Sequence, residues 1–392
     1  MASIARKNLL EDIPRFLVAQ AGIMFAVSLV TIQTGLQGGF NQSSSMLIDQ
    51  SRADIWVGSE NMEHLGLTLT IPYDNLTKAR KLAGVETAEA ILIRGTLWKQ
   101  PAEDKISSIT LIGATPNGLL FSPLIPVSGS FDDLRQPYTI ITDKTNLNGL
   151  NVKDKGGIGK INRYPATITG LTEGTKIIVF DNLVFTSLQN ANTYTNSSPP
   201  ANPASPPSPK PLKAEDPISY VLIKAKPGQD LNRLKQRLDL ALPDTKAYTR
   251  AEISQKTQIF WQERSGIGFI LGLGAVVGVI VGIVIVGQIL YSSVSDHLKE
   301  FGTLKAMGAS NWFIYSLIIE QALWMAILGY VPGIAICSGV ASWTAATQGL
   351  LILITPTSAV TVFGITVLMC VASAVFAIQK VTRVDPAIVF KS

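Results

Sequence analysis

Three long stretches without a charged side chain constrain the fold of this chain more than any other feature. They run from Phe16 to Ile48, from Ser265 to Ser295 and from Gln321 to Gln379. A helix needs about 20 predominantly apolar residues to cross the hydrocarbon core of a bilayer. The first two stretches therefore fit one helix each, and the third, with the apolar residues just before it, fits two. We predict membrane-spanning helices at residues 16–36, 265–294, 311–339 and 357–379.

The composition argues against several kinds of protein. Apolar residues make up 47% of the 392 residues and charged residues only 16%, which is unusual for a soluble globular protein. The net charge of +5 comes from residues scattered along the chain, with no basic block suited to nucleic acid. Both cysteines lie inside apolar stretches, and His64 and His297 are far apart in sequence. We therefore expect no disulfide framework, no metal site and no histidine-based catalysis.

Lysine and arginine residues predict the orientation of the chain in the membrane. They flank the predicted spans in segments 1–15, 295–310 and 380–392, whereas the loop 340–356 has none. Because cytoplasmic loops carry an excess of these residues, we expect those three segments in the cytoplasm and residues 37–264 outside it. This describes a multi-pass protein of the inner (plasma) membrane with both termini cytoplasmic.

The N-terminal segment 1–15 is expected to be an uncleaved amphipathic helix on the cytoplasmic surface of the membrane. The alternative is a secretory signal peptide. Its small-x-small cleavage sequence would be Ala19-Gln20-Ala21, but these residues lie at the start of the apolar stretch and not after it.

Residues 37–264 have the character of a folded domain with mixed α and β structure. Short apolar runs predict strands, and leucines near the end of the block recur at helical spacing. The predicted strands are 54–57, 87–93, 107–113, 138–142, 166–170, 176–180 and 220–225, and the predicted helices are 73–82 and 229–242. The predicted fold class is a membrane protein with four transmembrane α-helices and a large α+β extracytoplasmic domain inserted between helices 1 and 2.

Two segments of this domain differ from the rest. Residues 197–212 form a proline tract, with seven prolines among the 13 residues from Pro199 to Pro211, which supports neither helix nor interior strand. We expect an exposed, extended and disordered spacer there, and a partner-binding polyproline motif is the alternative. Residues 250–264 carry no turn signal and are expected to be a stalk. It would form one helix with the second span over Ala251–Ser295, about 68 Å long.

The charged segment 295–310, between the second and third spans, is the main candidate for a functional site. Apolar residues recur there at helical spacing, and Gly308 and Ser310 are typical of the end of one helix and the start of the next. An ordinary polar loop is the alternative. The candidate site residues are Asp296, His297, Leu298, Lys299, Glu300, Phe301, Thr303 and Leu304.

Two further features lie within the predicted spans. Gly274, Gly278 and Gly282 recur at every fourth residue and predict a face for close helix packing, within the subunit or across a dimer. Glu320 is an intramembrane carboxylate, which is costly unless it faces protein or water. A structural partner or a position near the cytoplasmic interface is favoured for Glu320 over a proton relay.

The run Lys299–Ala309, Lys-Glu-Phe-Gly-Thr-Leu-Lys-Ala-Met-Gly-Ala, resembles the cytoplasmic coupling segment of the FtsX/MacB family of ABC-transporter permeases. The opening of the chain from Asn8 to Ile23 resembles the same family, especially its cyanobacterial DevC type. Near the end of the chain, Arg383–Ala387 resembles the closing motif of the family. The residues that follow, Ile388–Lys391, depart from the acidic-Ala-Leu-Arg ending of that motif.

This resemblance implies the permease subunit of an ABC exporter, which transmits ATPase-driven motion to the periplasmic side. It implies a homodimer with a separate ABC ATPase subunit bound to the coupling segment, and a MacB-like periplasmic domain at residues 37–264. It also implies a periplasmic adaptor (membrane fusion protein) that leads to a TolC-like outer-membrane channel. Within the coupling segment, Phe301 would be the main anchor in a groove of the ATPase.

The sequence contains no ATP-binding motif of its own. The nearest match to a P-loop, Gly156–Lys160, has Asp154 where the first glycine belongs and Ile161 where Ser or Thr belongs. We therefore expect no enzyme activity, no directly bound cofactor, and ATP used by the partner subunit. The alternatives are a lipoprotein-release permease, an FtsX-like regulator of periplasmic hydrolases and, in another class, a membrane-anchored enzyme or receptor without an ATPase partner.

Overall fold

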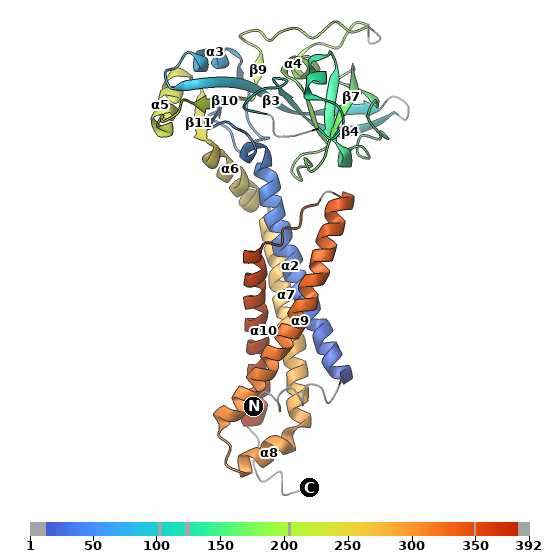
Figure 1. Cartoon of the computed structure of the whole chain (residues 1–392), viewed down its shortest axis with the longest axis vertical. Helices are drawn as coiled ribbons and strands as arrows, with labels where there is room; N and C mark the ends of the chain where they lie inside the picture. The colour runs from blue at the N-terminus through green and yellow to red at the C-terminus, as the bar shows by residue number, and fades with distance from the viewer. Residues whose placement is uncertain (1–12, 101–103, 122–125, 203–204, 349, 383–392) are drawn as a thin grey trace. The chain divides into compact units, whose positions relative to one another are not determined.

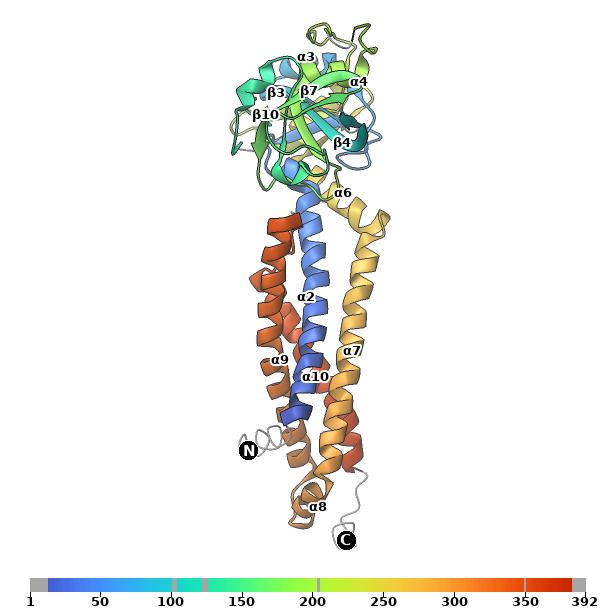
Figure 2. The same cartoon turned by 90° about the vertical axis from the view of Figure 1, so that its right-hand side faces the viewer.

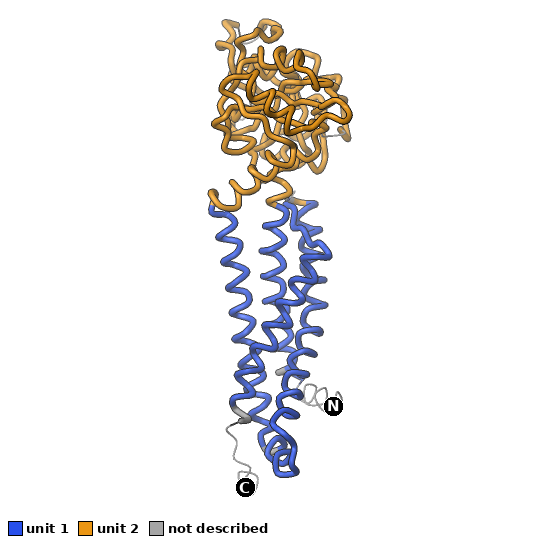
Figure 3. Tube along the Cα trace, turned by 90° about the vertical axis from the view of Figure 1, so that its left-hand side faces the viewer, with its two compact units in different colours: residues 1–39, 266–346, 350–392 blue, residues 40–265, 347–349 orange. Residues whose placement is uncertain are grey.

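The chain folds into two compact units in the computed structural model (Figure 3). The membrane unit comprises residues 1–39, 266–346 and 350–392, and the inserted domain comprises residues 40–265 and 347–349. Most of the predicted N-terminal amphipathic helix and the whole closing motif lie outside the described residues. The structure describes residues 13–100, 104–121, 126–202, 205–348 and 350–382.

Four helices among the described residues are long and apolar enough to cross a membrane, as the sequence predicts. They lie side by side in the membrane unit in both views (Figures 1 and 2). They are α2 (Ile13–Asp49), α7 (Ile267–Asp296), α9 (Asn311–Gln348) and α10 (Pro356–Thr382).

Two of these helices, α2 and α9, extend well past their predicted ends at residues 36 and 339. In α2 the polar side chains beyond the apolar stretch bond within the helix. Ser44 and Ser45 donate hydrogen bonds to the backbone carbonyl of Asn41 at 2.8 and 3.4 Å. The helix therefore continues beyond the apolar stretch, so the change from apolar to polar residues does not predict where α2 ends.

The predicted loop 340–356 is shorter in the structure because α9 continues to Gln348. Leu353 N donates a hydrogen bond to the carbonyl of Gly35 in α2 at 3.0 Å, so the loop is tied to the first helix. Pro356 is the first residue of α10, where no backbone N–H is needed. Thr355 and Ser358 cap this helix, since the hydroxyl of each accepts the backbone N–H of the other at 3.1 and 2.9 Å.

The described strands of the inserted domain are β1 (Ile55–Ser59), β2 (Ile71–Pro72), β3 (Val85–Gln100), β4 (Lys105–Ala114), β5 (Thr139–Asp143), β6 (Ile158–Ile161), β7 (Tyr164–Thr172), β8 (Leu183–Ser187), β9 (Pro217–Ile218), β10 (Tyr220–Ala225) and β11 (Thr245–Thr249). The main sheet has the order β11-β1-β10-β3-β4-β8-β5-β7-β6, and β6 also pairs with β3. The strands from β3 to β6 therefore close into a ring. The long β3 belongs both to this ring and to the rest of the sheet. Its first half pairs with β10, and its second half pairs with β4 and β6.

Helices cover this sheet on both faces, which confirms the α+β class. They are α3 (Asp74–Arg80), η1 (Phe131–Arg135), η2 (Lys144–Asn146), α4 (Leu188–Asn196), α5 (Leu231–Ala241) and α6 (Arg250–Ile259). Alternation along β10 sends side chains to two cores. Val221 joins the core formed with α3, α4 and α5, whereas Tyr220 joins the core that contains Leu47 of α2 and Ile253 of α6.

One predicted strand of the inserted domain, residues 176–180, is wrong. These residues form turns, and the next strand, β8, begins only at Leu183. Ile177 is buried, and Ile178 N donates a hydrogen bond to Ser43 Oγ at the end of α2 at 2.9 Å. The apolar run therefore packs as a loop on α2, which its composition alone does not distinguish from a strand.

The expected continuous helix over Ala251–Ser295 is also wrong. After α6 comes a π-helical turn at Phe260–Arg264, and α7 begins only after Gly266. Gly266 has a φ of +73°, a left-handed conformation that glycine adopts at little steric cost. Residues 250–264 are helical, but they are not one rod with the second span.

Candidate functional site

The segment between α7 and α9 contains the short helix that the sequence predicts. This helix, α8 (Leu298–Ala306), follows α7 after a single residue, His297. Gly308 has a φ of +90°, and Ser310 Oγ accepts a hydrogen bond from Phe313 N at 3.2 Å where α9 begins. The stop at Gly308 and the cap at Ser310 are both present.

Phe301 of α8 lies in the apolar core of the membrane unit. Its side chain is only 2% exposed and belongs to the same cluster as Val294 of α7 and Ile314 and Leu317 of α9. Leu304 packs against this cluster. The structure therefore contradicts the expectation that the ring of Phe301 inserts into a separate ATPase. The helical spacing indicated one apolar face but not whether the same chain or a partner covers it.

The opposite face of the segment is polar, with large apolar side chains on either side of the turn that follows α8. Asp296, Glu300 and Thr303 are exposed. Met307 is 71% exposed and Trp312 is 75% exposed. Met307 and Trp312 are not among the predicted site residues, although large apolar residues beside a predicted turn are a usable signal. A tryptophan also suits a membrane–water interface, so Met307 is the more specific candidate for a protein contact.

His297 joins the two helices of the segment. Its Nδ1 lies 3.2 Å from Glu300 Oε1, and its backbone carbonyl accepts a hydrogen bond from Phe301 N at 3.1 Å. Leu298 is half-buried at the start of α8. The side chain of Lys299 lies outside the described part of the chain. Of the eight predicted residues, the seven whose side chains the structure describes divide between a buried and an exposed face.

The glycine face of α7 packs against other helices of the same chain. A Cβ atom at Gly278 would lie 3.2 Å from Leu29 of α2, and one at Gly282 would lie 2.1 Å from Met369 of α10. Gly274 likewise faces α2. The close packing that the spacing predicted is therefore present within the subunit.

Glu320 is half-buried within α9. Its neighbour Gln321 is buried, and the Oε1 atom of Gln321 has no hydrogen-bond partner among the described residues. A proton relay needs a second carboxylate or histidine within hydrogen-bond reach of Glu320, directly or through a water molecule. A structural role for Glu320 thus needs fewer groups than a relay.

The described residues contain no group of three His, Cys, Asp or Glu side chains that could hold a metal ion. His64 of the inserted domain packs against the rings of Phe260 and Trp261, with centroids 4.3 and 5.0 Å away. Burial lowers the pKa of His64 to about 4, although the nearby Glu63 raises it. The neutral ring accepts a hydrogen bond from Gly66 N at 3.2 Å through Nδ1. This histidine is part of the packing around the π-helical turn.

Two family models match this chain in adjoining regions. The MacB-like periplasmic core domain matches residues 16–241, and the FtsX-like permease C-terminal domain matches residues 271–386. The second match contains most of α7 and the whole of α8, α9 and α10.

Two curated relatives have names that combine ATP binding with a permease. A probable export ATP-binding/permease protein of Pseudomonas fluorescens (strain Pf0-1) is 21% identical over 336 residues, which are 82% of this chain and 49% of the relative. The probable syringafactin export ATP-binding/permease protein SyfD of Pseudomonas syringae pv. syringae (strain B728a) is 24% identical over 211 residues, which are 52% of this chain and 30% of the relative. The chain thus spans about half, or less, of the length of these relatives.

Solved structures are similar at a lower level. The periplasmic region of MacB from Actinobacillus actinomycetemcomitans is 11% identical and covers 53% of this chain and 94% of its own, with a TM-score of 0.38. The extracellular domain of the noncanonical ABC-type transporter YknZ from Gram-positive bacteria is 10% identical and covers 50% of this chain and 98% of its own, with a TM-score of 0.34.

Proposed function

Because this chain belongs to the family of ABC-transporter permeases with a MacB-like periplasmic core domain and an FtsX-like C-terminal domain, we propose that it is the transmembrane subunit of an exporter. A separate ABC ATPase binds the segment 295–310 and uses the ATP. Its closing motion passes through the membrane unit to the periplasmic side, where the inserted domain acts.

The observation that carries this proposal is the attachment of α8 to the membrane helices. Phe301 is buried in one core with Val294 of α7 and Leu317 of α9. Protein cores are close-packed and transmit strain. A force on the exposed face of α8 therefore displaces α7 and α9 instead of bending a loop, which is the mechanical property that a coupling element needs.

The exposed face supplies the contacts to the ATPase. Apolar anchors concentrate binding energy in a few residues, whereas charged groups at a rim contribute more to register and specificity. Met307 is the proposed anchor, and Asp296, Glu300 and Thr303 form the polar rim. Phe301 keeps the segment in place from the buried side.

The proposed assembly is a homodimer in the inner membrane, with both termini in the cytoplasm. A periplasmic adaptor (membrane fusion protein) and a TolC-like channel complete the export path. The names of the curated relatives, which both refer to export, favour this function over lipoprotein release and over hydrolase regulation. Labelling of Ser310→Cys from outside intact cells would contradict the orientation.

The test is affinity purification of the tagged chain from native membranes, with identification of the chains that co-purify. We expect an ABC ATPase with the wild type and at least about tenfold less of it with Met307→Asp, because a desolvated charge replaces an apolar anchor. Leu240→Asp is the matched control, since Leu240 is an exposed apolar residue on α5. It should retain the ATPase.

Phe301→Ala separates the two faces of α8. It should lower the free energy of unfolding of the purified chain by about 3 kcal/mol, as expected for truncating a buried phenylalanine. Met307→Asp should leave that free energy nearly unchanged. If Met307→Asp retains the ATPase and exports normally, the exposed face of this segment is not the coupling site.

A further inference from the structure

The inserted domain contains a hollow large enough for a small molecule, which we call the α3–α4 hollow. Its volume is about 520 Å³, within the range of about 300–1,000 Å³ typical of ligand sites. Its walls come from α3, the loop after β4, the end of η1, the start of α4 and the end of the proline tract. These segments are far apart in sequence, so the hollow exists only in the folded domain.

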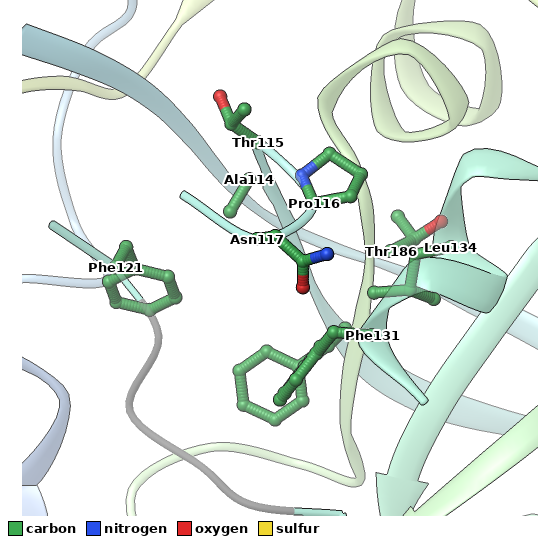
Figure 4. A pocket seen from close by; sticks show the side chains of 9 residues that line it. Ala114, Thr115, Pro116, Asn117, Phe121, Phe131, Leu134 and Thr186 are labelled. Carbon is green, nitrogen blue, oxygen red and sulfur yellow. The ribbon is translucent and has the colours of Figure 1, made fainter. Parts of the chain in front are cut away.

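A smaller cavity shares Thr115 and Pro116 with the α3–α4 hollow (Figure 4). Its volume is about 20 Å³, and apolar side chains such as Phe131 and Leu134 line it. A space of that size holds about one water molecule. Of these two spaces, the α3–α4 hollow is the one with room for a ligand larger than water.

The proline tract is a fixed wall of the α3–α4 hollow. It contains no helix or strand among its described residues, as the sequence predicts, but it is not a free spacer. The hydroxyl of Tyr164 donates a hydrogen bond to the carbonyl of Ser198 at 2.7 Å, and the hydroxyl of Tyr138 donates one to the carbonyl of Pro207. Beyond the tract, Asp74 N at the start of α3 donates to the carbonyl of Ala214 at 2.9 Å.

Along the chain, these hydrogen bonds occur both before and after Pro211 and Leu212, the two residues of the tract that line the hollow. Leu212 also packs against the main apolar core of the domain. Tyr73 and Leu188 line the hollow from α3 and α4. The apolar part of the lining is therefore held in place before any ligand arrives.

The charged part of the lining consists of two arginines, Arg80 and Arg135, and no carboxylate is among the described residues that line the hollow. Arg80 donates from Nε and Nη2 to the carbonyl of Ala88 at 2.9 and 2.8 Å. Arg135 donates from Nε to Asp132 at 3.2 Å. A guanidinium carries five N–H groups, so each arginine retains donors for an anion.

We propose that the α3–α4 hollow binds an anionic amphiphile. Its carboxylate or phosphate lies on Arg80 and Arg135, and its aliphatic chain lies against Tyr73, Leu188 and Leu212. Arginine suits this role because its planar group binds such anions through two parallel hydrogen bonds. The proposal goes beyond coupling to an ATPase and does not depend on it, since every residue involved belongs to the inserted domain.

The test uses the full chain in lipid nanodiscs, with octanoate and octyl phosphate as probes and octanol as their neutral counterpart. Binding is followed by saturation-transfer NMR, and empty nanodiscs correct for partitioning into lipid. We expect saturable binding of at least one anionic probe, at least about tenfold tighter than that of octanol. The tighter of the two anions identifies the preferred headgroup.

Arg135→Gln should weaken binding of the anionic probe by about tenfold, because a charge-assisted hydrogen bond is lost. This variant is preferred to Arg80→Gln, since Arg135 pairs with the exposed Asp132 and not with the backbone of β3. Leu212→Ala should weaken binding of the same probe by a smaller factor. Arg233→Gln, an exposed arginine on α5, is the matched control and should bind like the wild type.

Three results would overturn the proposal. Octanol could bind as tightly as the anions, Arg135→Gln could bind like the wild type, or no probe could bind above the level of empty nanodiscs. None of these results bears on ATPase retention by the segment 295–310, so the two proposals fail separately.

Discussion

The inserted domain and the membrane unit each contain a buried polar side chain, and the two side chains differ in their hydrogen bonds. In the inserted domain, Asp143 is fully buried, and its carboxylate accepts hydrogen bonds from the backbone N–H and the hydroxyl of both Thr145 and Thr175, at 2.7 to 2.9 Å. In the membrane unit, Gln20 is buried on α2, and neither polar atom of its amide has a partner among the described residues. The contrast holds between these two sites and is not absolute, because the buried Trp56 Nε1 of the inserted domain also has no partner among the described residues.

The membrane unit relies instead on the close approach of its helices. Lipid tails are as apolar as leucine side chains, so helices in a membrane gain little from hydrophobic burial and associate through packing. Gly22 of α2 faces Ile285 of α7, and Gly282 of α7 faces Met369 of α10. We therefore expect the inserted domain to be most sensitive to the loss of a polar partner. The membrane unit should be most sensitive to added volume.

The largest effect is expected for Asp143→Ala in the inserted domain. It leaves two backbone N–H groups and two hydroxyls without their acceptor, and we expect a loss of about 4 kcal/mol in the free energy of unfolding. Denaturant unfolding followed by circular dichroism measures it. Glu173→Ala is the control, because Glu173 is exposed and pairs only at the surface with Lys144. Equal losses in the two variants would remove the contrast between the units.

A somewhat smaller effect is expected for Gly282→Leu in the membrane unit. Its Cβ would lie 2.1 Å from Met369 Sδ and 2.9 Å from Ala26 Cβ, so α2, α7 and α10 must shift. We expect a loss of about 3 kcal/mol, measured by thermal unfolding in detergent. Gly272→Leu on the same helix is the control, since a Cβ at Gly272 meets nothing within 4 Å. If Gly272→Leu is equally harmful, the close packing at Gly282 does not explain the result.

The smallest effect, counted per pH unit, is a pH dependence from His64. Its pKa is about 4 in the folded domain and 6.5 in the unfolded chain, so the unfolded chain binds the proton first as the pH falls. The stabilisation is complete above pH 6.5 and is lost between pH 6.5 and 4, at no more than about 1.4 kcal/mol per pH unit. Unfolding of wild type and His64→Phe across this range measures it. A variant with the wild-type slope would assign the dependence to other groups.

Local chemistry predicted much of this protein from its sequence. The charge-free stretches predicted four spanning helices because a charged side chain is costly in hydrocarbon. Gly308 predicted the end of α8 and Ser310 predicted the start of α9, because a residue in the left-handed conformation and a hydroxyl cap each act within one turn. The short apolar run at residues 220–223 predicted β10 because a run of that length suits a buried strand. Each of these signals depends on residues close together in sequence.

What the sequence determined by itself was therefore the number of spans, the class of the inserted domain and the position of the candidate site. Only the tertiary structure decided which surface covers an apolar face. Phe301 faces its own bundle, and the proline tract is held by Tyr138 and Tyr164 as a wall of the α3–α4 hollow. It also decided that Gly266 separates the stalk from the second span and that β6 closes a ring with β3. These outcomes depend on the free energy of contacts between residues far apart along the chain, which no local pattern encodes.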